Sequence, residues 1–195
     1  MEIVTYERSA NTLKLTGQRV TLRKIEERDL PTLWDYIYGD PSPQWKKWDA
    51  PYFEHKYVPF EEYMESSIRN KNRSDEFQRI IEVDGAIIGT VAYYWDYEPT
   101  RWLEAGIVIY DPAYWNGGYG TEALSLWIDH LFTTKEIGRV GITTWSGNER
   151  MMKAAEKVGM QLEGRMRKCR YYDGVYYDSI RMGMIREEWE EQRAL

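Results

Sequence analysis

Residues 114–124 read YWNGGYGTEAL, with glycine at positions 117, 118 and 120 directly ahead of a segment with helical periodicity. Glycine inside a regular element costs about 0.5–1 kcal/mol relative to alanine, so such a cluster implies a backbone that must turn tightly or be approached closely. In the helix predicted to follow, the apolar residues recur at helical spacing: Ala123, Leu124, Trp127, Ile128, Leu131 and Phe132. The stretch therefore predicts a bare backbone loop that leads into a helix N-terminus.

Four interpretations of this loop can be compared. The simplest is a plain strand-to-helix turn. A P-loop needs a lysine after its last glycine, and Thr121 follows Gly120 here, which excludes it. A dinucleotide fingerprint is met by Gly118, Gly120 and Ala123, but the acid it requires about 20 residues later is missing from TTWSG (143–147). The remaining interpretation is an anion site, because the unpaired N–H groups and partial positive charge of a helix N-terminus hold a phosphate without a metal or a lysine.

Composition narrows the class of protein. The chain has 195 residues, which favours one domain, and its 43% hydrophobic content is ample for a core. A net charge of −6 disfavours a nucleic-acid partner, and no run of 18 apolar residues predicts a membrane span. The single Cys169 excludes an internal disulfide, and with only His55 and His130 no zinc ligand set of the usual spacing can be assembled, so we expect no metal. A cytoplasmic protein is the simplest expectation.

The rest of the chain alternates strand and helix patterns. Strands are predicted at 19–25, 102–110 and 138–145, and hairpins at 77–95 and 160–185, around Asp84-Gly85 and Asp173-Gly174. Helices are predicted at 30–38, 59–71 and 149–158, with a short acidic helix at the end of the chain. Residues 1–18 read as an arm or an added strand, ahead of a single mixed α/β domain over 19–195. The aromatic, proline-rich segment 40–58 reads as a long structured loop, a kind of loop that often carries function.

Several segments resemble the GNAT acyl-CoA N-acyltransferases, and they follow one another in the same order as in that family. That family has a strand followed by Q/R-x-x-G-x-G/A at the start of a helix, and WNGGYG (115–120) is similar to it. Trp115 stands where the family has Gln or Arg, a departure that resembles the branch of ribosomal-protein N-terminal (RimJ/RimL-like) and spermidine acetyltransferases. Three further segments match: VTLRKIEERDLPTLW (20–34), NERMMKAAEKVGMQLEGRMRK (148–168) and YYDGVYYDSIRMGMI (171–185).

The resemblance implies the GNAT fold: a central, mostly antiparallel mixed sheet of about seven strands, splayed between its fourth and fifth strands and flanked by about four helices. It also implies acetyl-CoA as cofactor, with the pantetheine in the gap, the pyrophosphate on the glycine loop and Asn148 bonded to the pantetheine arm. Asn148 is equally placed to be a plain helix N-cap. The implied cofactor residues are Val108, Ile109, Tyr110, Trp115, Asn116, Gly117, Gly118, Tyr119, Gly120, Thr121, Asn148 and Lys153.

Amide formation requires the amine to lose a proton, since a primary amine with a pKa of about 10 is almost fully charged at neutral pH. Glu104 interrupts the apolar strand WLEAGIVIY (102–110) and is the candidate general base, with a salt-bridged structural carboxylate as the equal alternative. The backbone N–H near Tyr110 is the expected oxyanion donor. The general acid is open, because Ala155 stands where many family members have Tyr, and Met151 stands where the branch often has Ser.

The acceptor site is predicted in the loop 45–57, with an addition from the end of the 77–95 hairpin. Aromatic faces together with an acid suit a cationic amine, with cover for the core as the alternative for each single ring. The candidate residues are Trp45, Trp48, Asp49, Tyr52 and Trp95. Because this loop lies outside the cofactor motif, we expect it to respond to the amine and not to the cofactor.

The resemblance thus implies an N-acetyltransferase that moves an acetyl group from acetyl-CoA to a primary amine by direct attack in a ternary complex. The acceptor is a small molecule or a peptide amine, with a protein N-terminus and a small polyamine both open. A non-catalytic acyl-CoA-binding or sensing domain is the leading alternative, and a dinucleotide-binding oxidoreductase is a distant third. Acyl-chain length and pairing into a homodimer are left open.

Overall fold

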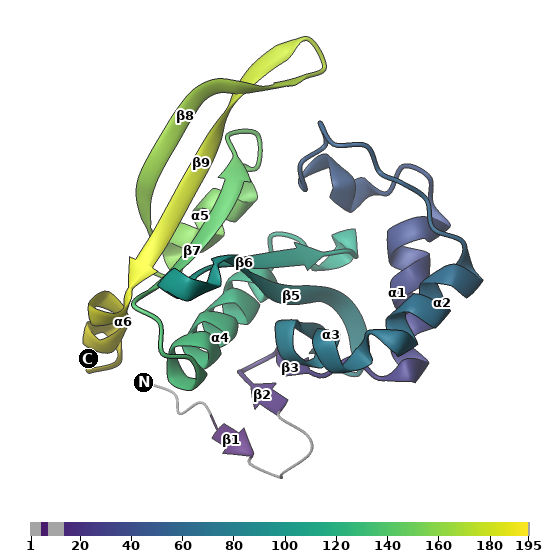
Figure 1. The fold of residues 1–195 in the computed structure, drawn as a ribbon, viewed down its shortest axis with the longest axis horizontal. Helices are drawn as coiled ribbons and strands as arrows, with labels where there is room; N and C mark the ends of the chain where they lie inside the picture. The colour runs from purple at the N-terminus through teal and green to yellow at the C-terminus, as the bar shows by residue number, and fades with distance from the viewer. Residues whose placement is uncertain (1–4, 8–13, 195) are drawn as a thin grey trace.

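The computed structural model describes residues 5–7 and 14–194, which form one open sheet of nine strands with six α-helices (Figure 1). The strands are β1 (Thr5–Glu7), β2 (Lys14–Thr16), β3 (Thr21–Arg23), β4 (Gln78–Val83), β5 (Ala86–Tyr97), β6 (Trp102–Ile109), β7 (Arg139–Trp145), β8 (Gln161–Tyr172) and β9 (Val175–Ile185). The helices are α1 (Leu30–Trp34), α2 (Phe60–Arg69), α3 (Lys71–Phe77), α4 (Tyr119–Thr134), α5 (Glu149–Lys157) and α6 (Arg186–Ala194). The strand order is β1-β2-β3-β4-β5-β6-β7-β9-β8.

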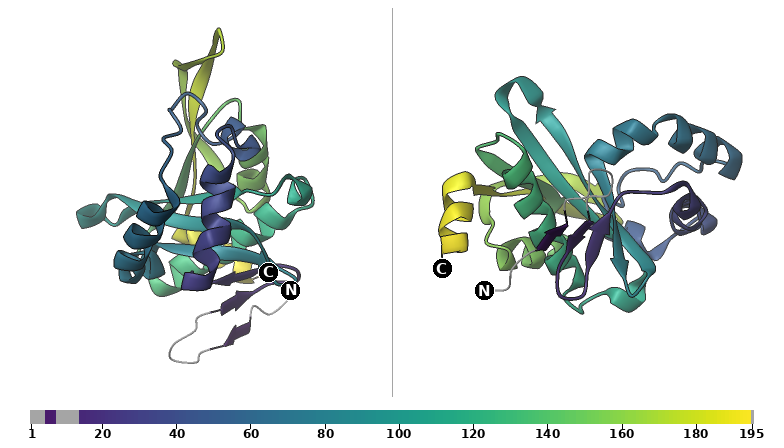
Figure 2. Two further views of the ribbon diagram at one scale, coloured as in Figure 1. Left: turned by 90° about the vertical axis from the view of Figure 1, so that its right-hand side faces the viewer. Right: turned by 90° about the horizontal axis from the view of Figure 1, so that it is seen from below.

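Turn chemistry at the two predicted hairpins is confirmed. Asp84 and Gly85 have φ of 48° and 81°, and Asp173 and Gly174 have φ of 48° and 76°. Positive φ at both central residues defines the tight turn that matches strand twist, and Asp-Gly tolerates it well. The second turn joins β8 to β9, and this hairpin extends well beyond the other strands (Figures 1 and 2).

The sheet and its helices are larger than predicted. β2 pairs with β3, and Leu15 is 1% exposed in the core, so the folded unit begins before the predicted boundary at residue 19 and the arm contributes an added strand. Among the described helices, α3 was not separated from α2, because KNRSDEF offers no apolar stripe from which to predict it. The remaining predicted elements are all found within a few residues.

The predicted splay lies between β6 and β7, the one parallel pair in the described sheet. These strands pair only at Leu103–Val140 and Glu104–Gly141. From Ala105 onward β6 pairs with β5 alone, and β7 continues along β9. The sheet therefore opens into two arms, and the backbone edge of β6 that faces β7 has no strand beside it.

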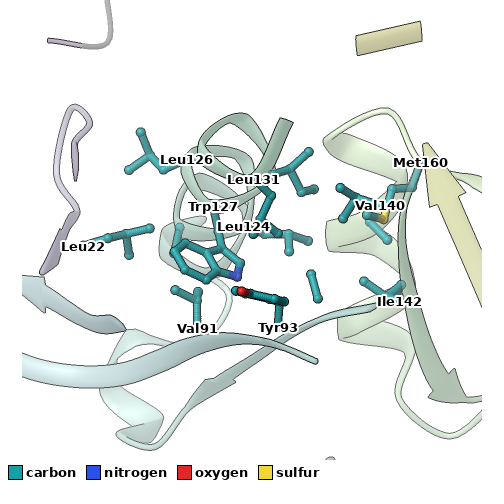
Figure 3. Packing of buried hydrophobic residues seen from close by; sticks show 14 of the residues in the cluster. Leu22, Val91, Tyr93, Leu124, Leu126, Trp127, Leu131, Val140, Ile142 and Met160 are labelled. Atoms are coloured by element: carbon teal, nitrogen blue, oxygen red, sulfur yellow. The ribbon is translucent and has the colours of Figure 1, made fainter. Parts of the chain in front are cut away.

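Strand alternation gives the sheet two apolar faces. Helix α4 covers one face, where Trp127 packs against Val91 and Tyr93 (Figure 3). On the opposite face, α1 and Trp45 pack with Ile80 and Tyr110. Because successive side chains of a strand point to opposite faces, neighbours such as Ile80 and Ile81 serve different clusters. Both α4 and the long loop 40–58 are thereby anchored beside the splay.

Candidate active site

A cleft of about 1190 Å³ opens where β6 and β7 separate. Its walls come from β6, β7, the glycine loop with the start of α4, the start of α5 and the loop 40–58. The predicted residues that line it are Trp45, Trp48, Asp49, Tyr52, Val108, Ile109, Tyr110, Trp115, Asn116, Gly118, Gly120, Thr121, Asn148 and Lys153. Four predicted residues, Glu104, Gly117, Tyr119 and Trp95, do not line it.

The glycine loop is shaped to leave the N-terminus of α4 open. Gly118 is the N-cap with φ of 85°, a left-handed conformation that favours glycine. At Gly120, a Cβ would come no closer than 3.7 Å to its nearest neighbour, Ile109 Cγ1, so glycine is not required there by packing. The first-turn N–H groups of α4 therefore face the cleft without side-chain bulk, as an anion site at a helix N-terminus requires.

Gly117 and Tyr119 act from outside the cleft. Arg19 Nη1 donates to Gly117 O at 2.9 Å, and the Arg19 guanidinium lies 4.5 Å from the centre of the Tyr119 ring. Glu122 Oε1 accepts from the backbone N–H groups of Arg19 (2.8 Å) and Val20 (3.0 Å). No local pattern singles out Arg19, because its partners lie about a hundred residues away along the chain. These contacts fix the loop and do not face a ligand.

The open backbone edge of β6 differs from the prediction. Tyr110 N donates to Ile88 O at 2.8 Å, so its N–H points toward β5 and is not the expected oxyanion donor. Since N–H groups alternate along a strand, those of Ile107 and Ile109 point toward β7, where pairing has ended. Ile109 O accepts from Trp115 Nε1 at 2.9 Å. The backbone groups open to a ligand are thus those of Ile107 and the N–H of Ile109.

Asn148 makes two hydrogen bonds at the wall of the cleft. Its Oδ1 accepts from Met151 N at 3.1 Å, which confirms the N-cap of α5. Its Nδ2 donates to Trp48 O at 2.9 Å, and Trp145 Nε1 donates to the same oxygen at 2.9 Å. The amide therefore caps α5 and anchors the loop 40–58, and its bond to the pantetheine arm stays a prediction.

Two arginines occupy the aromatic faces predicted for a cationic amine. The Arg150 guanidinium lies 4.2 Å from the Trp48 ring centre and 4.5 Å from that of Trp115. Its buried Nη1 has no hydrogen-bond partner within the described part of the chain. Arg170 lies 5.1 Å from the Tyr52 ring centre in the same manner. Both arginines line the cleft; Arg150 lies in the matched segment 148–168 but was not singled out there, and Arg170 lies outside the matched segments.

Glu104 lies beneath the cleft floor. Its side chain is fully buried, and Oε1 accepts from Trp102 Nε1 at 3.0 Å and pairs with Arg139 Nη1 at 3.1 Å. Arg181 Nη1 lies 3.8 Å from the same oxygen. Oε2 accepts from Thr143 Oγ1 at 3.1 Å, and Thr143 is exposed in the cleft. The expected carboxylate is therefore beside the cleft but separated from it by a hydroxyl.

The directions of the side chains of Ala155, Met151 and Trp95 bear on the predictions for the general acid and for the acceptor site. Ala155 is fully buried in the core, and Met151 packs against that core at the cleft wall. Trp95 also packs against the core, because it alternates with Tyr94 along β5. Tyr94 is the residue that faces the cleft, and burial, followed by the Glu104 carboxylate, raises the pKa of its hydroxyl.

In residues 5–7 and 14–194 no cluster of three or more His, Cys, Asp or Glu side chains could hold a metal ion. Over the same part of the chain no helix is both long and apolar enough to cross a membrane.

Comparison with known proteins shows the family to which the chain belongs. The sequence model of the acetyltransferase (GNAT) domain matches residues 19–161, and the chain belongs to this family of N-acetyltransferases. It is similar to the prophage-derived uncharacterized N-acetyltransferase YokL of Bacillus subtilis, 27% identical with 90% of this chain and 94% of that protein covered. It is also similar to the spermidine N(1)-acetyltransferase of Escherichia coli K12, 27% identical over 89% of this chain and 90% of that protein.

A solved structure with the same fold is that of RimL, a ribosomal-protein alpha-N-acetyltransferase in complex with coenzyme A. Its TM-score is 0.69 at 18% identity, and the match covers 88% of this chain and 97% of that chain. The family assignment makes the dinucleotide interpretation of the glycine loop wrong, and the GNAT fold predicted from the motifs is confirmed.

Proposed function

We propose that this N-acetyltransferase transfers an acetyl group from acetyl-CoA to a primary amine by direct attack in a ternary complex. The main support for the proposal is that a single cleft contains an unpaired strand edge, an open helix N-terminus and a floor with polar side chains. The first two suit an extended, phosphate-bearing cofactor. The third lies beside the point where the strands separate, and it suits an amine that meets the cofactor there.

The residues present fit CoA. The N–H groups at the start of α4, beside Gly118 and Gly120, suit the pyrophosphate. The open backbone of Ile107 and Ile109 suits the amides of pantetheine, and Ile109 N–H replaces that of Tyr110 as the oxyanion donor. The unpartnered guanidinium nitrogen of Arg150 suits an anionic oxygen. When bound, acetyl-CoA supplies the thioester carbonyl that the amine attacks.

The acceptor side of the cleft is proposed around Asp49, Tyr94 and Thr143. The carboxylate of Asp49 suits an ammonium group, and the hydroxyl groups can accept hydrogen bonds from the N–H groups of the ammonium. Trp48 and Tyr52 are less suited to cation–π binding of the amine than predicted, because Arg150 and Arg170 already lie over their rings. A protein N-terminus and a polyamine such as spermidine both remain candidates, in line with the named activities of RimL and the spermidine acetyltransferase.

The function is tested by free-thiol release from acetyl-CoA with a panel of amines: spermidine, a peptide with a free N-terminus, and a peptide whose only amine is lysine. We expect amine-dependent thiol release with at least one of them. Binding of CoA without thiol release from any amine would support the non-catalytic alternative instead.

The cofactor site is tested by Gly120→Val. The branched side chain would project beside the first-turn N–H groups of α4 and keep a phosphate from approaching them, so we expect the Kd for CoA to rise at least about ten-fold. Gly118 is unsuitable for this test, since its φ of 85° would strain any replacement. Gly138→Val is the control, because a Cβ at Gly138 meets nothing within 4 Å. An unchanged Kd in titration calorimetry with Gly120→Val would exclude the phosphate site at this helix.

A further inference from the structure

We propose that the Thr143 hydroxyl relays the proton of the acceptor amine to the buried Glu104 carboxylate. The inference rests on the proposed function and names the group of this chain that touches the reacting nitrogen. In this arrangement Thr143 is the catalytic residue in contact with substrate, and Glu104 acts through it.

Burial separates the two residues. Glu104 is 0% exposed and does not line the cleft, so an amine in the cleft cannot contact this carboxylate directly. Thr143 is exposed and lines the cleft, and its Oγ1 lies 3.1 Å from Glu104 Oε2. Direct proton transfer to Glu104 would require the floor of the cleft to open, whereas transfer through Thr143 requires no rearrangement.

The contacts of Glu104 divide between its two oxygens. Oε1 is taken by the Trp102 indole at 3.0 Å and by Arg139 at 3.1 Å, with Arg181 at 3.8 Å. Oε2 accepts from the Thr143 hydroxyl. The oxygen that faces the cleft is therefore the one whose partner can exchange a proton, since a guanidinium is not deprotonated in proteins.

The direction of the Thr143 hydroxyl follows from its partner. An ionised carboxylate only accepts, so Thr143 must donate its one proton to Glu104 Oε2, and its two lone pairs are left to accept. Tyr94 lies directly opposite Glu104 in the β5–β6 register and also lines the cleft. Both lone pairs of Thr143 Oγ1 are therefore available to an N–H of the amine.

The step is balanced within this chain of atoms. The ammonium N–H bond breaks and a bond to Thr143 Oγ1 forms, while the original Oγ1–H bond breaks and a bond to Glu104 Oε2 forms. The products are a neutral amine, an intact hydroxyl and a neutral glutamic acid. After the amine attacks the thioester, its second proton leaves with the CoA thiol, and the proton on Glu104 returns to solvent by the same path.

The test uses Thr143→Val, which keeps the shape and removes the hydroxyl, with Thr143→Ser as the conservative partner. The measurements are kcat at saturating acetyl-CoA and amine over pH 6–10, the Kd for CoA and Tm. We expect Thr143→Val to lower kcat at pH 7 by about 10²–10⁴, the range for a positioned general base, and Thr143→Ser to retain most of it. The Kd for CoA stays unchanged in both variants.

Two further results distinguish a relay from a structural role. The kcat defect of Thr143→Val should shrink as the pH approaches the amine's own pKa of about 10, because the amine then arrives deprotonated. Adding Glu104→Gln to Thr143→Val should lower kcat no further, because the two residues act as one unit. The relay would be overturned if Thr143→Val kept the kcat of the wild type at pH 7, or if its loss of kcat were equal at every pH. In either case, amine-dependent turnover by the wild type would still support the proposed function. Absence of wild-type turnover with every amine would overturn both.

Discussion

At the residue scale, the position of Glu104 depends on the absence of a side chain at Gly141. These two residues are paired across the last step of the β6–β7 ladder. A Cβ on Gly141 would lie 2.6 Å from Glu104 Oε1 and against the Arg139 guanidinium. Glycine here makes room for an ion pair and does not provide a turn. In a sequence, glycine within a strand indicates a weakened strand or a β-bulge. The role of Gly141 in making room for an ion pair therefore could not be predicted.

Gly141→Ala tests this packing. The added methyl group must displace the Glu104–Arg139 pair, and overfilling of a packed site usually costs about 1–3 kcal/mol, so we expect a loss of that size in the free energy of unfolding. Urea titration measures it. The matched control is Gly138→Ala, in which the new methyl group meets nothing within 4 Å and should leave stability within about 0.5 kcal/mol. Equal stabilities of the two variants would show that the pair moves aside without cost.

At the element scale, the loop 40–58 belongs to both sides of the cleft. Trp48 O is held by Trp145 and Asn148, and the Trp48 ring packs on Arg150 and lies 6.4 Å from the Trp115 ring. Trp115 is part of the glycine motif, so the loop directly contacts the segment that is proposed to hold the cofactor. The expectation that it responds to the amine alone does not fit these contacts.

Trp48→Ala should therefore raise the Kd for CoA several-fold. The substitution removes one of the two rings that hold the Arg150 guanidinium, and cation–π contacts contribute about 0.5–2 kcal/mol each. Tyr57→Ala serves as the control in the same loop, because its ring packs on Trp34 and Tyr38 and does not line the cleft. Both affinities can be measured by titration calorimetry. A change in the KM for the amine with an unchanged Kd for CoA would return Trp48 to the acceptor side, as first predicted.

At the scale of the whole molecule, α4 holds together a sheet that is nearly divided in two. Beside the short β6–β7 ladder, its apolar face packs on Val91 and Tyr93 of one arm and on Val140 and Ile142 of the other (Figure 3). The opposite end of this helix from the glycine loop contains a buried histidine. His130 stacks on Trp127 at 5.2 Å, and burial, together with the charges of Arg79 and Lys135, lowers its pKa to about 4.

The stability of the whole fold should consequently depend on His130 as the pH falls. The folded state disfavours the charged imidazole, so its contribution is complete above the unfolded pKa of 6.5 and is lost as the pH falls from there toward 4. A shift of this size corresponds to about 3 kcal/mol in the free energy of unfolding. Urea unfolding of the wild type and of His130→Phe between pH 7 and pH 4 gives two curves of unfolding free energy against pH. The difference between these curves measures the contribution of His130, because the carboxylates titrate in both proteins. Parallel curves would show that His130 is solvated in the folded protein.

The sequence by itself determined the order of the elements, the two Asp-Gly hairpins, the glycine loop ahead of α4 and the family. The elements and turns depend on periodicity or turn chemistry within about twenty residues, where side-chain spacing sets the local conformation, and the family depends on the order of several such segments. Only the tertiary structure decided which backbone groups of β6 remain open, that Trp48 meets Asn148 and that Thr143 lies between Glu104 and the cleft. Those contacts join residues 100 and 39 positions apart, and they follow from where two strands stop pairing. No local pattern encodes that point, because it is set by the packing of α4 and the ion pairs beneath the cleft.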